Sequence, residues 1–219
     1  MKTYGQYCSL ARGLDLVGDR WTLLIVRELL SLGECRYVDL QRGLPDIATN
    51  LLAGRLRDME EASLVQRSRL PRPSNAAVFS LTERGAALEG VVREFIKWGA
   101  PLMSPPRPDE SFRAHWLLLP LRALCRDNDP AVARQTVRVG TAEDGCDVTA
   151  EGGAVLVAPS EPGTRPDAVV AGDPGALVAL FAGQLPVDAA ARAQLITGNL
   201  DAVRRIVGGI PVPIERVAS

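Results

Sequence analysis

The residues with the clearest chemical use lie on one predicted helix, and they are suited to contact with nucleic acid. At helical spacing, Asn50, Ala53 and Arg57 point to the same side. An asparagine can pair with adenine, an arginine can reach guanine or phosphate, and small alanine lets the helix approach a duplex closely. Thr49 flanks this face and can bond a phosphate. An ordinary amphipathic surface helix is the alternative interpretation.

Arginines also mark the pair of short predicted strands that follows this helix. Arg67 and Arg69 share one face of the first strand, Arg72 lies in the turn, and residues 62–82 contain no acid. Such a hairpin can reach along the sugar-phosphate backbone or into the minor groove, where it contributes affinity and salt dependence more than sequence choice. The alternative is a solvated hairpin whose charges keep its edge from aggregating.

The sequence offers little for other kinds of chemistry. Its four cysteines, Cys8, Cys35, Cys125 and Cys146, show no C-x-x-C spacing, and the single His115 leaves little to build a zinc site from. No nucleophile elbow, phosphate loop or recognisable pair of carboxylates occurs. The sequence therefore predicts neither an enzyme nor a bound cofactor or metal.

Charge and hydropathy bound the setting of the chain. The formal net charge of -1 excludes a uniformly basic nucleic-acid coat, so the positive potential is local to the hairpin. The N-terminus lacks the regions of a signal peptide, and the most apolar run, 21–32, contains Arg27 and Glu28 and is too short to span a bilayer. We expect a cytoplasmic protein with no membrane partner and with mostly reduced thiols.

A series of short helices and a hairpin is expected to position the candidate contacts. The sequence predicts a helix that begins at Leu10, helices over 20–32, 37–44 and 48–62, strands over 65–70 and 78–81, and a helix over 82–98. Asp19 is placed to cap the second helix, and Pro45 ends the third. This order is typical of a winged helix-turn-helix, whose fourth helix here would enter the major groove. Arg55 lies nearer the buried side of that helix, so an ion pair with Glu28 or another acid is at least as good an interpretation as a DNA contact.

Short motifs along residues 7–100 carry a family resemblance. They are Cys8, Gly18-Asp19-Arg20-Trp21, Asp39-Leu40, Asn50-Leu51-Leu52, Arg55-Leu56, Glu60-Glu61, Leu64-Val65 and Leu81-Thr82. In their order and spacing the segment resembles the HxlR-type winged-helix family of bacterial transcription regulators. The resemblance implies binding to double-stranded operator DNA as a two-fold homodimer. One departure is Ala48, where relatives often carry a serine cap, so Asp46 or Thr49 is the expected substitute.

An apolar stripe near the end of this half has nothing in the hairpin to cover it. The expected dimer interface combines this stripe with the first helix and consists of Leu10, Leu14, Leu88, Val92, Phe95 and Trp98. A dimer is favoured because a single recognition helix reads too few base pairs for useful specificity. Packing against the C-terminal half of the same chain is the alternative.

The second half is expected to form a separate domain, so that the fold class is multidomain α+β. Domains are expected over 1–100 and 111–219, joined by a proline-rich linker over 101–110. The elements expected in the second domain are a helix over 112–125 kinked at Pro120, strands over 136–139, 146–149, 154–158 and 167–171, and helices that begin after Asp173 and Asn199. This pattern predicts one mixed sheet with helices over one face.

Apolar motifs give the second domain a resemblance of its own, over about 110–210. They are Val170-Ala171-Gly172-Asp173-Pro174 with Leu177, Leu180 and Phe181, and Ile196-Thr197-Gly198-Asn199. In these motifs the segment resembles the sterol carrier protein type two-like fold, which implies an apolar cavity for a small ligand. The candidate lining residues are Trp116, Leu117, Leu121, Leu180 and Phe181, and ordinary core packing is the alternative for each.

Together these features predict a dimeric transcription regulator whose operator affinity is modulated by a small apolar ligand. Two other functions stay open. Cys8 falls where some HxlR-type proteins carry a reactive cysteine, and Arg12, one helical turn on, would favour its thiolate in a redox sensor; a buried structural thiol is the alternative. A lipid-binding protein without a DNA role would leave Arg57, Arg67 and Arg72 without a purpose.

Overall fold

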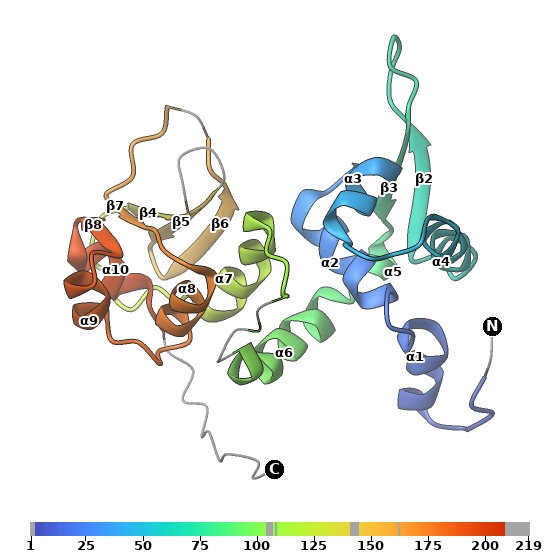
Figure 1. Ribbon diagram of the computed structural model, residues 1–219, viewed down its shortest axis with the longest axis horizontal. Helices are drawn as coiled ribbons and strands as arrows, with labels where there is room; N and C mark the ends of the chain where they lie inside the picture. Colours follow the sequence, from blue (N-terminus) through green and yellow to red (C-terminus); the bar gives the residue numbers. More distant parts are fainter. Residues whose placement is uncertain (1–2, 104–106, 108, 141–144, 162, 209–219) are drawn as a thin grey trace. The chain divides into compact units, whose positions relative to one another are not determined.

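The computed structural model describes residues 3–103, 107, 109–140, 145–161 and 163–208 (Figure 1). The chain divides into two compact units, residues 1–92 and 93–219, each with its own sheet. Helix α6 (Glu89–Gly99) begins in the first unit and ends in the second. Pro105, Pro106 and Pro108 of the expected linker lie outside the described residues.

The first unit is a winged helix-turn-helix. Its elements before α6 are α1 (Ser9–Val17), α2 (Thr22–Leu32), β1 (Cys35–Arg36), α3 (Tyr37–Gly43), α4 (Thr49–Glu61), β2 (Val65–Arg69), β3 (Ala77–Leu81) and α5 (Glu83–Ala86). Helix α2 begins two residues later than predicted, with Trp21 at its cap position. Asp19 still serves the start of the helix, because its Oδ1 accepts hydrogen bonds from the backbone N–H groups of Trp21 at 2.8 Å and Thr22 at 3.1 Å.

The sheet of the first unit has the strand order β1-β3-β2, and both pairings are antiparallel. Strands β2 and β3 form the predicted hairpin, whose turn extends away from the helices of this unit (Figure 1). Strand β1 was not predicted, because two residues are too few to show an alternating pattern. It forms through its pairing with β3, in which Cys35 lies opposite Phe79.

The prediction of one helix over 82–98 is wrong, because the segment is divided into α5 and α6. Thr82 caps the first of these, as its Oγ1 accepts from Gly85 N at 3.0 Å. Gly85 lies so close to the hairpin that a Cβ there would fall 1.9 Å from the Leu64 carbonyl oxygen. The backbone of α5 therefore lies directly against the hairpin at Gly85. Helix α5 ends at Ala86, and α6 begins at Glu89.

A buried ion pair joins α2 to the end of α3 within the first unit. Glu28 is fully buried, and its Oε1 lies 2.6 Å from Arg27 Nη2. The same Arg27 nitrogen donates to the Gly43 carbonyl oxygen at 3.2 Å. A Cβ on Gly43 would fall 1.9 Å from Glu28 Oε2, so this close approach of the two helices requires glycine.

The second unit is an α+β structure with one mixed sheet, as predicted. After α6 its elements are the 3-10 turns η1 (Ala100–Met103) and η2 (Ala114–Leu117), then α7 (Leu118–Leu124), β4 (Gln135–Gly140), β5 (Gly145–Glu151), β6 (Ala154–Pro159), β7 (Ala168–Val170), α8 (Pro174–Phe181), α9 (Val187–Arg192), β8 (Ile196–Gly198) and α10 (Leu200–Ile206). The strand order is β6-β5-β4-β7-β8; the β4–β7 pair is parallel and the other pairs are antiparallel.

Several details of this unit differ from the prediction. The helix expected over 112–125 is divided into η2 and α7, and the break lies before Leu118 rather than at Pro120. Pro120 is the third residue of α7, where a backbone N–H has no intrahelical partner, so the helix accommodates it. Helix α9 and strand β8 were not predicted, because both are short.

Both predicted helix caps in this unit are confirmed. Asp173 Oδ1 accepts from Ala176 N at 3.0 Å at the start of α8. Asn199 Oδ1 accepts from Asp201 N at 3.0 Å and from Ala202 N at 3.3 Å at the start of α10. These caps were predictable because each bonds to a backbone group only two or three residues away.

One continuous core fills the second unit, between one face of the sheet and its helices. The expected pocket residues Leu117, Leu121, Leu180 and Phe181 all belong to this core, together with alternate residues of the strands such as Val137 and Val148. Each of these side chains is almost fully buried, whereas Trp116 is half-buried. Such a placement fits ordinary core packing, and an apolar cavity remains a prediction.

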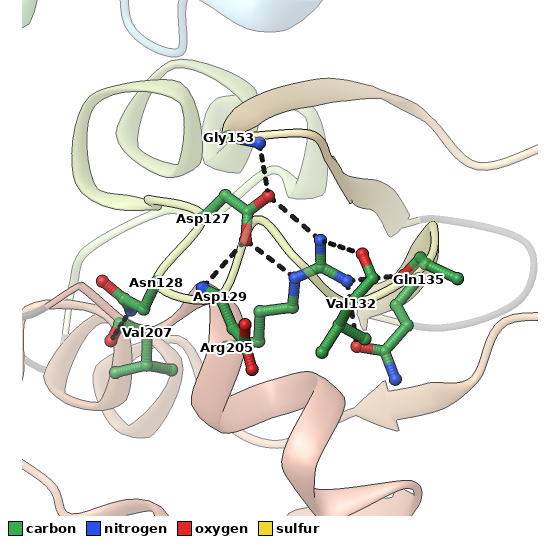
Figure 2. A network of polar contacts seen from close by, with 9 residues as sticks. Asp127, Asn128, Asp129, Val132, Gln135, Gly153, Arg205 and Val207 are labelled. Atoms are coloured by element: carbon green, nitrogen blue, oxygen red, sulfur yellow. Dashed lines mark hydrogen bonds and ion pairs between the residues drawn. The ribbon is translucent and has the colours of Figure 1, made fainter.

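A buried polar network ties α10 to the loop that follows α7 (Figure 2). Arg205 Nε lies 2.7 Å from Asp127 Oδ1, and Arg205 Nη2 lies 3.0 Å from Oδ2. The guanidinium also donates to the carbonyl oxygens of Val132 at 3.0 Å and Ala133 at 2.7 Å. Gly153 N donates to the same carboxylate at 2.9 Å. The hydrogen bond from Arg205 lowers the pKa of Asp127 to about 2.

Candidate nucleic-acid interface

Helix α4 turns an apolar stripe to the core of the first unit and leaves the opposite side open. Thr49, Asn50 and Arg57 are exposed, and Ala53 is half-buried between them. The predicted contact residues of this helix therefore share an accessible face. Their side chains are short or neutral except for Arg57, which brings the positive charge.

The start of α4 is held by α3 rather than by a side-chain cap. Ala48 occupies the cap position without a capping bond, and within the described residues neither Asp46 nor Thr49 substitutes for one, so that expectation is wrong. Instead, the Tyr37 hydroxyl donates to the Thr49 carbonyl oxygen at 2.6 Å. Gln41 Nε2 donates to Thr49 Oγ1 at 3.0 Å.

Arg55 is engaged within the protein. Its Nη1 donates to Asp58 Oδ2 at 3.0 Å, and its Nε lies 3.5 Å from Asp19 Oδ1. The suggested pairing with Glu28 is wrong, because Glu28 pairs with Arg27. The alternative of another acid is confirmed, and Asp19 links the start of α2 to α4.

The β2–β3 hairpin presents its arginines at exposed positions. Arg67 Cζ lies 5.8 Å from the centre of the Phe79 ring, directly across the hairpin. Arg69 Nη1 donates to the Asn75 carbonyl oxygen at 3.3 Å, and Arg72 lies exposed in the turn. These contacts restrain two of the side chains without neutralising their charge.

Comparison with known proteins assigns the family of the first unit. The sequence profile of the HxlR-like helix-turn-helix family matches residues 16–106. The HTH-type transcriptional regulator YodB of Bacillus subtilis (strain 168) is 33% identical over 91 residues, which are 42% of this chain and 80% of YodB. The chain belongs to the HxlR-like family.

Two further proteins are similar to the N-terminal part of the chain. The uncharacterized HTH-type transcriptional regulator YvaP of Bacillus subtilis (strain 168) is 31% identical over 94 residues, which are 43% of this chain and 86% of YvaP. The solved structure of reduced YodB from B. subtilis is 30% identical, covers 47% of this chain and 100% of that chain, and has a TM-score of 0.40. The family profile ends at residue 106, so it describes the N-terminal part of the chain.

The residues expected at a dimer interface of this HxlR-like protein differ in exposure. Those with exposed side chains are Leu10 and Leu14 of α1 and Phe95 and Trp98 of α6. The rings of Phe95 and Trp98 meet edge to face, with centres 6.3 Å apart. Leu88 is half-buried, whereas Val92 is 7% exposed and therefore lies in the interior rather than on a surface open to a partner.

The thiols fall into two classes. Cys8 is exposed at the start of α1, which corrects the alternative of a buried structural thiol. Arg12 was expected to lie near this thiol and favour its thiolate. The guanidinium of Arg12 lies over the Tyr7 ring, with Cζ 5.3 Å from the ring centre. Cys35 and Cys125 are buried, and burial raises the pKa of each to about 12.

The described residues lack two other kinds of structure. No group of three or more His, Cys, Asp or Glu side chains there is arranged to hold a metal ion. No helix among those residues has the length and apolar character needed to cross a membrane.

Sequence reasoning missed Tyr37 and Gln41 as part of this surface. Tyr37 is the first residue of the helix predicted over 37–44, and its hydroxyl reaches α4. The available signal was the spacing, because residues four apart share one face of a helix. Their common partner, Thr49, follows the turn and is not predictable from helical period alone.

Proposed function

We propose that this HxlR-like protein binds operator DNA as a homodimer and regulates transcription. Helix α4 enters the major groove, where Asn50 and Arg57 contact bases and Ala53 permits close approach. Thr49 contacts a phosphate. The observation that supports this assignment most is the separation of roles on α4. Its apolar stripe is buried and Arg55 is bound to acids, while Thr49, Asn50 and Arg57 are exposed.

The hairpin holds the sugar-phosphate backbone in this proposal. Arg67, Arg69 and Arg72 are exposed on an element that extends away from the helices of the first unit (Figure 1). Contacts of this kind add affinity without reading sequence. Gel-shift titration on DNA upstream of the chain's own gene tests the proposal, and an absence of sequence-specific retardation at low salt would refute it.

The dimer forms through exposed apolar side chains of α1 and α6, chiefly Leu10, Leu14, Phe95 and Trp98. These side chains are exposed in the single chain, and covering them would remove apolar surface from water. Sedimentation equilibrium of the full chain is expected to give twice the monomer mass. Trp98→Glu should give a monomer, and a monomeric wild-type protein would contradict this part of the proposal.

The second domain, taken as residues 111–219 after a linker over 101–110, is proposed to sense a small apolar ligand in a sterol-carrier-like fold. Its support is a core that is separate from the DNA-contact residues and rich in apolar side chains around Leu121, Leu180 and Phe181. Half-buried Trp116, which directly precedes the core residue Leu117 in the sequence, would report binding by its fluorescence. Native mass spectrometry and thermal-shift screens should find an apolar compound that alters operator affinity, and finding none would exclude the ligand.

Redox control through Cys8 is the second candidate, favoured by one observation. Its thiol is exposed at the start of α1, where an oxidant in solution can reach it. Cys8→Ser is expected to abolish any effect of oxidants on DNA affinity. An unchanged response in that variant would exclude Cys8 as the sensor.

A lipid-binding role without DNA binding is distinguished by the arginines. Charge reversal at Arg57, Arg67 and Arg72 together should abolish DNA binding if the proposed interface is correct. Unchanged DNA affinity in that variant would refute the proposed interface, whereas a wild-type chain without affinity for DNA would favour the lipid-binding alternative.

A further inference from the structure

We propose that Gln41 and Tyr37 are positioning residues for DNA binding, which aim the Thr49 hydroxyl hydrogen at a phosphate oxygen. The inference rests on the proposed function and deepens it at one contact. It starts from two hydrogen bonds that leave α3 and end on the first residue of α4.

The hydrogen bond from Gln41 decides where the Thr49 hydroxyl can donate. A threonine hydroxyl has two acceptor positions and one hydrogen. Gln41 Nε2 donates to Thr49 Oγ1 at 3.0 Å, so the hydroxyl hydrogen points away from Gln41. Thr49 is exposed, and no oxygen within the described part of the chain accepts that hydrogen. A phosphate oxygen can accept a hydrogen bond from this hydroxyl.

The hydrogen bond from Tyr37 fixes the backbone beneath the hydroxyl. Its 2.6 Å bond ends on the carbonyl oxygen of Thr49, the same residue that bears the donor. Ala48 provides no side-chain cap, so the first turn of α4 lacks the restraint that usually prevents fraying. Tyr37 and Gln41 lie one helical turn apart on α3, and their two hydrogen bonds hold the first residue of α4 in place without binding the N–H groups that a cap would bind.

A neutral hydroxyl contact has a signature that separates it from the arginine contacts. Arginine neutralises phosphate and releases counterions, so its loss reduces the dependence of affinity on salt. Loss of the Thr49 hydroxyl, or of its orientation, should lower the affinity for DNA and leave the salt dependence of that affinity unchanged. A purely structural role of Gln41 would instead lower the unfolding midpoint.

A double-mutant cycle tests the inference in the full-length chain. Fluorescence anisotropy measures binding of Gln41→Met, Thr49→Val and the double variant to a mixed-sequence duplex of about three helical turns at low salt. We expect each single variant to bind about three- to tenfold more weakly, and the double variant to bind no more weakly than Thr49→Val. Unchanged affinity of Gln41→Met, or additive losses in the double variant, would overturn the inference.

Two conservative variants keep the test decisive if a substitution disturbs folding. Thr49→Ser keeps the hydroxyl and should bind within about twofold of wild type, whereas Tyr37→Phe loses only one oxygen and should weaken binding. Wild-type binding in Tyr37→Phe, or loss in Thr49→Ser equal to that in Thr49→Val, would contradict the assigned roles. If the wild-type protein itself does not bind the duplex, the proposed function fails; if it binds and only the cycle is additive, the inference alone fails.

Discussion

Arg204 and Arg205 are adjacent in α10, yet their guanidinium groups lie in opposite surroundings. The Arg205 side chain is 3% exposed and is bonded to the Asp127 side chain, which is fully buried. The Arg204 side chain is 47% exposed and pairs with Asp188 and Asp201 at the surface. Removing one partner of a buried pair leaves the other charge unsatisfied, whereas an exposed pair contributes little.

Arg205→Met is therefore expected to destabilise the second unit far more than Arg204→Met. Calorimetry should show the midpoint of that unit lowered by at least about 4 °C for Arg205→Met and barely moved for Arg204→Met. The two substitutions match in residue type and in helix, so propensity cancels between them. Equal shifts would contradict a structural role for the network in Figure 2.

Acid should weaken the same network over a defined range of pH. The pKa of Asp127 is lowered from 3.8 to about 2, chiefly by the hydrogen bond from Arg205. Because the folded pKa lies below the unfolded one, the stabilisation is fully present above about pH 4 and is lost as the pH falls towards 2. Urea unfolding measured across this range should show a falling free energy of unfolding. In Asp127→Asn, the part of this fall that comes from Asp127 should be absent. An identical pH profile in the variant would rule out Asp127 as its source.

Gly54→Ala is expected to stabilise the fold and to weaken DNA binding. Nothing lies within 4 Å of a Cβ built on Gly54, so alanine should add about 0.5–1 kcal/mol to the free energy of unfolding. The new methyl group lies on the side of α4 that approaches DNA in the proposed complex. Gly90→Ala in α6, where the space is equally open, is the matched control and should leave affinity unchanged. Equal DNA affinities of Gly54→Ala and wild type would place the duplex elsewhere.

Each arginine of the hairpin should contribute to the salt dependence of binding. Replacing Arg67, Arg69 or Arg72 by alanine is expected to reduce the slope of log affinity against log salt by about 0.9 for each phosphate that the variant no longer neutralises. Arg192→Ala removes an exposed arginine of α9, outside the proposed interface, and should leave the slope unchanged. Identical slopes in all four variants would exclude the hairpin from the backbone contact.

Features set by neighbours in sequence were predictable, and those set by distant contacts were not. Asp19 and Asp173 were identified as caps because their partners lie two or three residues away. Helix α5 ends at Ala86, beside the close approach of Gly85 to Leu64, and no periodicity shows that approach. Strand β1 exists only through pairing with β3.

The same division applies to the candidate DNA interface. The exposed face of α4 followed from helical spacing, because its buried stripe is apolar. The partners of Arg55 were only partly predictable: an acid was expected, but Glu28 is taken by Arg27 and Asp19 is supplied by the turn before α2. The bond from Tyr37 to Thr49 joins residues twelve positions apart across a turn, so it required the structure.

Whether α4 reads DNA is tested most directly at Arg57. On a duplex that the wild-type protein protects in footprinting, anisotropy titration compares Arg57→Ala with Arg192→Ala. We expect Arg57→Ala to lose about 1–3 kcal/mol of specific binding and Arg192→Ala to bind as wild type does. Wild-type affinity and sequence preference in Arg57→Ala would contradict the assignment of α4 as the recognition helix.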